Sequence, residues 1–298
     1  MTPFIVAGAA GQIGRPIYSD PRGSLVVYAK VGTVDSVQGS PNYTFNLNGA
    51  ARVELSARGV ILQADHLDGL AARRVDQTYA LVQGNARKSV DFISDSREAA
   101  RFNKSPMRPD RLSDRFEVTS DSAALSTWRV RPGSPKLEVT LDPTPRTREA
   151  LLQSIDLPHA FKAVDHRTGL TTDPVHTPYV EDMTVTASSG KCFFIPAEGT
   201  TPAKLQTGLF ERPVHIHLVK TLDLPEKPPV VTDYDVTGNR MTFDFTKSVG
   251  EVVISGNVHY RVDGGNGGMG DADKVTINTD EELKLTGIHI ERNLGATR

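Results

Sequence analysis

The chain has 298 residues, with 34 Lys and Arg against 36 Asp and Glu, so its formal net charge is −2 at pH 7. This near balance argues against a nucleic-acid-binding protein, because such proteins usually carry a basic excess. The single cysteine excludes intrachain disulfides, cysteine-rich zinc sites and CxxC redox chemistry. The sequence also lacks the run of about 20 apolar residues that a membrane-spanning helix requires.

The first segment, residues 1–24, is predicted to be a flexible N-terminus. Gly8, Gly11 and Gly14 have a spacing typical of dinucleotide-binding turns, but Pro16 and Pro21 would break the helix that must follow such a turn. We therefore expect no cofactor here. The apolar residues of this segment are not preceded by Lys or Arg, so a signal peptide is not evident.

Most of the remaining chain has the composition of short β-strands, which are rich in Val, Ile, Thr, Phe and Tyr and are separated by Gly, Asn and Asp. A first β block is predicted over residues 25–102 and a second over residues 231–298. The strands predicted in these blocks are 25–31, 43–47, 52–56, 60–64, 79–83, 87–92, 233–236, 240–246, 251–255, 258–262, 274–278, 283–286 and 288–291. The chain is therefore predicted to be all-β.

The middle segment, residues 103–230, is predicted to be irregular, β-rich and proline-rich. Thirteen of the 19 prolines lie between Pro132 and Pro229. A short helix is expected over residues 147–155, and residues 225–229 are interpreted as a stiff linker to the second β block. The strands predicted in this segment are 116–120, 136–141, 183–187, 192–195 and 214–220.

Internal repeats are the strongest sequence signal. A short segment that begins with glycine recurs at Gly49, Gly84, Gly238 and Gly256. An Ala-Asp pair recurs at Ala64 and Ala272. Gly49 precedes Ala64 by 15 residues and Gly256 precedes Ala272 by 16, so the same unit recurs in both blocks. Each Gly segment is interpreted as a tight turn that opens a strand. Recurrence predicts stacked β repeats rather than one closed barrel.

Residues 255–262 (SGNVHYRV) and 272–287 (ADKVTINTDEELKLTG), echoed by residues 62–68 and 82–90, carry a resemblance to a known family. They resemble the OstA-like family of periplasmic lipopolysaccharide-transport proteins, of the LptA and LptC type. The resemblance extends over residues 45–92 and 231–292. It implies β-jelly-roll slabs that stack head to tail, with an apolar trough that shields lipid acyl chains, and it implies a periplasmic or otherwise extracytoplasmic location.

Such a trough needs a continuous apolar lining rather than a reaction centre, because burial of acyl methylenes supplies the binding energy. Alternation places Val252, Ile254, Val258 and Tyr260 on one face. The candidate lipid-binding residues are Val60, Leu62, Phe243, Phe245, Val252, Ile254, Val258, Tyr260, Val275 and Ile277. No catalytic set is apparent, so a non-enzymatic lipid carrier is expected.

His215 and His217 stand two residues apart on a predicted strand, a spacing found in metal sites of β-proteins. Because a third ligand is not evident, we interpret them as surface histidines and expect no metal. Two alternatives stay open: a metal-dependent β-fold enzyme that uses this pair, and a structural or glycan-binding β module without a lipid trough.

The last predicted strand, residues 288–291, presents Ile288 and Ile290 at what is expected to be an open sheet edge. We expect this edge to add to another β-jelly-roll transport protein or to a second copy of the chain. Residues 25–31 are the expected partner edge. The expected partners are thus lipid or lipopolysaccharide and other β proteins, without nucleic acid.

Overall fold

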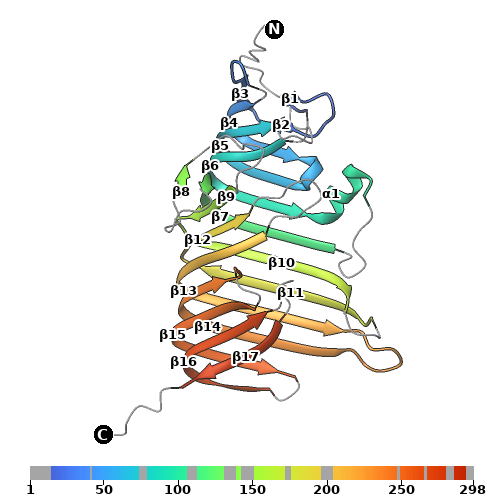
Figure 1. Cartoon of the computed structure of the whole chain (residues 1–298), viewed down its shortest axis with the longest axis vertical. Helices are drawn as coiled ribbons and strands as arrows, with labels where there is room; N and C mark the ends of the chain where they lie inside the picture. The colour runs from blue at the N-terminus through green and yellow to red at the C-terminus, as the bar shows by residue number, and fades with distance from the viewer. Residues whose placement is uncertain are drawn as a thin grey trace. The chain divides into compact units, whose positions relative to one another are not determined.

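The structure is a computed structural model in which the described residues are all-β, as the sequence predicts (Figure 1). The residues described are 15–40, 42–73, 79–105, 113–130, 139–141, 151–171, 176–195, 204–246, 249–264, 267–279 and 285–292. No helix in these ranges is long and apolar enough to cross a membrane. The strands are β1 Tyr18–Ser19, β2 Val26–Tyr28, β3 Val31–Ser36, β4 Tyr43–Leu55, β5 Val60–Arg73, β6 Tyr79–Asp95, β7 Ser113–Val130, β8 Val139–Leu141, β9 Leu151–Leu157, β10 Phe161–Leu170, β11 Pro178–Ala187, β12 Ser189–Ile195, β13 Lys204–Leu222, β14 Val230–Asp244, β15 Gly250–Asp263, β16 Gly268–Thr279 and β17 Leu285–Glu291.

The chain divides into two compact units, which we call unit 1 and unit 2. Unit 1 is drawn from Met1–Pro106, Glu117–Pro158 and Phe193–Lys204. Unit 2 is drawn from Met107–Phe116, His159–Cys192 and Leu205–Arg298. Among the described residues, the chain thus passes from one unit to the other within β7, between β9 and β10, within β12 and after the first residue of β13.

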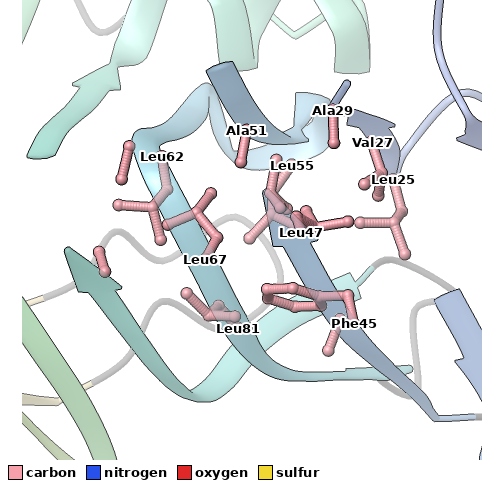
Figure 2. Close-up of a cluster of buried hydrophobic side chains, with 14 of the residues drawn as sticks. Leu25, Val27, Ala29, Phe45, Leu47, Ala51, Leu55, Leu62, Leu67 and Leu81 are labelled. Carbon is pink, nitrogen blue, oxygen red and sulfur yellow. The ribbon is translucent and has the colours of Figure 1, made fainter. Parts of the chain in front are cut away.

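Unit 1 is built on the antiparallel series β3–β4–β5–β6, with β2 also paired to β4 and β1 to β2. Alternate residues of these strands point to one face, and the apolar ones form the core (Figure 2). Leu47 and Leu67, which pair directly across β4 and β5, are both completely buried. At one end of this core the rings of Tyr18, Tyr43 and Tyr79 lie together, with centroids 5.1 and 5.7 Å apart.

Unit 2 is built on the antiparallel series β10–β11–β13–β14–β15–β16–β17. Its buried side chains again occupy one face of alternating strands, while the opposite face is polar. The residues predicted to share a face in β15 do so: Val252, Ile254 and Val258 are buried, and Tyr260 is half-buried.

Long strands replace the pairs of short strands that the sequence predicts. β4 joins predicted strands 43–47 and 52–56, and β15 joins 251–255 and 258–262. Each joint is a β-bulge, at which two consecutive residues adopt positive φ without ending the strand. These φ values are 73° and 48° for Gly49 and Ala50, and 76° and 51° for Gly256 and Asn257. The prediction that these glycines form turns that open strands is therefore wrong.

The sequence repeat is nevertheless a repeat of strand register. In unit 1 the bulge of β4 ends at Ala51, which pairs with Ala64 of β5. In unit 2 the bulge of β15 ends at Val258, which pairs with Ala272 of β16. The Ala-Asp pair thus lies opposite the bulge in both units. The same local geometry is built twice from similar residues.

Gly84 and Gly238, the other two members of the repeat, lie inside strands with no positive φ. Packing, rather than a turn, favours glycine there. A Cβ atom on Gly238 would lie 2.5 Å from Cγ2 of Ile254, and one on Gly84 would lie 3.1 Å from the carbonyl oxygen of Asp68. A side chain at Gly238 would therefore collide with the core residue of the next strand.

The helix predicted over residues 147–155 is wrong in its described part, because residues 151–155 belong to β9. Tertiary contacts decide this segment: Gln153 donates to the carbonyl oxygen of Leu81 at 2.9 Å, and Trp128 donates to Oγ of Ser154 at 2.8 Å. In the described part of the chain the α-helix is α1, Ser96–Asn103, which the sequence pattern did not predict. It begins where Oδ1 of Asp95 accepts a hydrogen bond from the Arg97 amide.

The predicted linker at residues 225–229 is a hairpin connection. Leu222 at the end of β13 pairs with Val230 at the start of β14, so the two strands belong to one sheet. The block boundary predicted between residues 230 and 231 thus falls inside a hairpin of unit 2. The middle segment, predicted to be irregular, contains long strands such as β13, because proline at strand ends and bulges does not prevent pairing.

We expect Gly256→Ala to lower the free energy of unfolding by about 1–3 kcal/mol, because alanine is strained at positive φ. Its Cβ would also lie 3.0 Å from Nδ2 of Asn239. The matched control is Gly268→Ala, where φ is not positive and no atom lies within 4 Å of the new Cβ. Urea denaturation measures both variants. Equal effects of the two substitutions would contradict the importance of the bulge.

Candidate functional site

The candidate site is the apolar side of the β13–β17 sheet in unit 2. Two rows of residues run directly across the strands in hydrogen-bonded register, and we call them the apolar rows. Because side chains alternate along each strand, both rows point to the same face. The first row is Phe210, Met241, Ile254, Val275 and Ile290, and the second is Gly208, Phe243, Val252, Ile277 and Ile288.

The apolar rows are buried in their middle and become half-buried at the edge strand β17. Ile254 and Val275 have no exposed surface, whereas Ile277, Ile288 and Ile290 are half-buried. Among the described residues, β17 pairs with β16 alone, so β17 forms an edge of the sheet. The apolar face of unit 2 therefore continues to that edge instead of ending in charged side chains.

Aromatic rings fill the middle of this face. The centroids of Phe161 and Phe210 are 4.9 Å apart, and those of Phe210 and Phe243 are 5.5 Å apart. Phe243 in turn stacks on Phe245 at 5.3 Å. A Cβ atom on Gly208 would lie 2.1 Å from Cζ of Phe243, so this glycine makes room for the ring.

The structure places the ten predicted lipid-binding residues in both units. Eight lie on the apolar face of unit 2: Phe243, Phe245, Val252, Ile254, Val258, Tyr260, Val275 and Ile277. Val60 and Leu62 lie on β5 of unit 1, where Leu62 belongs to the core cluster and Val60 packs against it. Tyr260 accepts a hydrogen bond from Nη2 of Arg292, whose guanidinium lies 5.7 Å from the ring centroid.

The other predicted sheet edge, residues 25–31, is paired differently in the structure. β2 covers residues 26–28 and is paired on both sides, to β1 and to β4. Within the described ranges, β3 pairs with β4 alone, and its Val31 is exposed. The open edge of unit 1 near residues 25–31 is therefore β3 rather than β2.

A cluster of charged side chains interrupts the buried face of unit 2 at β10, β11 and β13. Arg167, Glu181 and Lys220 are directly opposite one another in register, and we call them the charged row. Arg167 Nη2 lies 2.5 Å from Oδ2 of Asp165, and Glu181 lies 4.0 Å from Arg167 and 3.8 Å from Lys220. The side chains are 9–25% exposed, so four ionisable groups share one largely buried region.

The charges of this cluster contribute to shifts in the pKa values of Arg167 and Tyr234. Burial alone would lower the pKa of Arg167, but the carboxylates of Asp165 and Glu181 outweigh it and raise that pKa above its ordinary value. Burial, together with the charge of Glu181, raises the pKa of Tyr234. Both groups therefore stay protonated at neutral pH.

None of these charged residues was predicted from the sequence as part of a site. Asp165 and Arg167 have the same strand parity as the buried Phe161 and Ala163. This shared parity was the signal in the sequence that could have placed Asp165 and Arg167 on the buried face. A charged residue on a strand is usually solvated, however, and the pattern alone does not show where a buried face changes from apolar to charged.

His215 and His217 lie on the opposite, polar face of unit 2. Their Nε2 atoms lie 3.0 Å from the carboxylates of Asp235 and Asp233 on β14. Arg261 of β15 also contacts Asp233, at 3.9 Å. Among the described residues, no group of three or more His, Cys, Asp or Glu side chains is arranged to hold a metal ion.

The chain matches no protein-family model, and searches of the curated proteins and of the solved structures gave no match.

We expect the double substitution His215→Gln and His217→Gln to lower the free energy of unfolding by at most about 1 kcal/mol per pair, because such half-exposed contacts contribute little. Thermal melting with elemental analysis of the purified protein tests this. A stoichiometric metal ion that is present in the wild type and lost in the variant would contradict it.

Proposed function

We propose that this protein is a non-enzymatic, lipopolysaccharide-type lipid-binding and transport protein of the cell envelope. In this proposal its β units are jelly-roll slabs of OstA-like type, and acyl chains lie along the apolar face of unit 2. The observation that carries the proposal is the continuation of the apolar rows to the edge strand β17. Sheets that have no apolar ligand or partner usually place charge at such an edge.

The energetics favour an acyl chain as the ligand. Each buried methylene contributes about 0.8 kcal/mol, so a chain of about twelve methylenes gains roughly 10 kcal/mol before the costs of binding. Half-buried Ile277, Ile288 and Ile290 provide apolar contact surface next to the edge. Removal of that surface from water is the driving force for loading.

The same edge supports a partner. No described residue pairs with the backbone of β17 on the side away from β16, and Ile288 and Ile290 extend its apolar face. Strand addition by another β-jelly-roll transport protein, or by a second copy, would satisfy both. Head-to-tail joining would extend the apolar rows and provide a path for lipid in an extracytoplasmic compartment.

Lipid loading is tested by Ile277→Asp in protein produced in a Gram-negative host. We expect native mass spectrometry to show a lipid adduct on the wild type and its loss from the variant, because a carboxylate among acyl chains carries a large desolvation cost. Asn278→Asp adds the same charge on the other face of the same strand and should keep the adduct.

The absence of any adduct from the wild type, or its equal loss from both variants, would contradict the proposed function. Thermal melting accompanies each measurement. A variant that has unfolded is replaced by Ile277→Ser, which removes the apolar contact without adding a charge.

Edge association is tested by light scattering after size exclusion over a concentration series. We expect the mass of the wild type to rise with concentration and Ile290→Lys to stay monomeric, because this lysine puts a charge into the apolar face that the added strand would cover. The control is His289→Lys on the opposite face. A monomer at all concentrations, with the amides of residues 288–291 already protected from exchange, would show that the edge is covered within one chain.

A further inference from the structure

The charged row is an unusual feature in a face that is otherwise apolar. Taking ions from water costs several kcal/mol each, and replacing a buried ion cluster by apolar residues is often neutral or stabilising. Stability therefore does not explain why Arg167, Glu181 and Lys220 stand on the buried face of β10, β11 and β13. Groups of this kind mark candidate ligand sites.

The two cations of this cluster differ in how closely they approach a carboxylate. Arg167 forms a close ion pair with Asp165 at 2.5 Å. Lys220 Nζ lies 3.8 Å from Oε2 of Glu181, which is beyond hydrogen-bond distance. Its other contact within the described ranges is the ring of Tyr179, whose centroid lies 5.9 Å away. An ammonium group carries three donors, so Lys220 retains hydrogen-bonding capacity.

Lys220 is also the most accessible member of the cluster. Its side chain is 25% exposed, compared with 14% for Arg167, 11% for Asp165 and 9% for Glu181. A cation is therefore more accessible to a ligand than either carboxylate. Tyr234 of β14 pairs with Leu218 of β13, and burial together with the charge of Glu181 raises the pKa of its phenol.

The position of Lys220 connects it to the apolar face. On β13, Ile216, Leu218 and Lys220 alternate on one side of the strand, and the first two are buried. The face thus changes from apolar to charged within about 7 Å, the distance between alternate residues of a strand. An amphiphile is the class of ligand whose own polarity changes over such a distance.

We propose that Lys220 binds the anionic, phosphate-bearing head group of the lipid whose acyl chains lie along the apolar face of unit 2. This inference rests on the proposed function and adds the class and orientation of the ligand. The head group lies at the β10, β11 and β13 end of the face, and Arg167 and Asp165 keep the neighbouring charges balanced. The acyl chains extend toward the apolar rows.

The experiment compares two lipids with the same acyl chains, dioleoyl phosphatidic acid and dioleoylglycerol, by displacement of a fluorescent fatty acid from the full chain. We expect Lys220→Gln to weaken binding of phosphatidic acid about tenfold and to leave dioleoylglycerol unchanged, because the substitution removes one charge-assisted hydrogen bond. Lys220→Arg should restore most of the affinity.

The matched control is Lys274→Gln on the polar face of β16, where Nζ lies 2.7 Å from Glu291. It should leave the affinity for both lipids unchanged. Because Lys220→Gln leaves Glu181 with fewer counter-charges, the double substitution Lys220→Gln with Glu181→Gln repeats the test if the single variant does not fold.

Each other outcome overturns the proposal. Equal weakening of both lipids would give Lys220 a structural role, and unchanged binding of phosphatidic acid would give it none. Displacement of the fatty acid by inorganic phosphate alone would identify a phosphate site that does not need a lipid. Failure of the wild type to bind either lipid would overturn the proposed function as well. The outcomes in which the wild type binds both lipids overturn the inference about Lys220 alone.

Discussion

Positive-φ bulges inside long strands are the constraint on which the rest of this fold depends. An L-residue in the left-handed conformation costs about 1–2 kcal/mol, and these strands carry it at Ala50, Lys88, Ser89 and Asn257. The hydrogen-bonded ladders on either side of each bulge compensate for that cost. The bulge lets one strand bend without ending. The core residues on both sides of the bulge lie on the same face. Ile254 and Val258 of β15 illustrate this, since both are completely buried.

The sequence is informative about faces and less informative about where strands begin and end. The alternation of Val252 and Ile254 predicted their common face, and composition predicted the all-β class. The bulges were not predicted, because a glycine in a strand pattern is equally consistent with a turn, and Lys88 and Ser89 carry no glycine signal at all. Residues 151–155 show the same limit: their helical propensity is overridden by the pairing of β9 and the buried hydrogen bond of Gln153. The lining role of the apolar residues stays a proposal.

The buried face of the unit 2 sheet has two chemically different parts, the apolar rows and the charged row. The apolar rows hold their side chains by dispersion and hydrophobic burial, which do not select a ligand by its charge. The charged row acts through direct electrostatic contacts, which depend on distance and on the sign of the charge. Unit 1 differs here, since the end of its core is formed by the aromatic cluster of Tyr18, Tyr43 and Tyr79. Burial raises the pKa of Tyr79 to about 12 and raises that of Tyr18 as well, so both phenols keep their protons at neutral pH. The two interiors therefore present different chemistry to whatever they contact.

The placement of the bulges also determines how such a chain can lengthen during evolution. In each unit a strand that carries a bulge is followed by a straight strand, as β4 is followed by β5 and β15 by β16. The smallest piece that repeats this geometry is a hairpin. Duplication of a hairpin preserves strand direction, the position of the bulge and the assignment of faces. Insertion of a single strand would reverse the direction of every strand after it. Homologous chains of different length are thus expected to differ by whole hairpins.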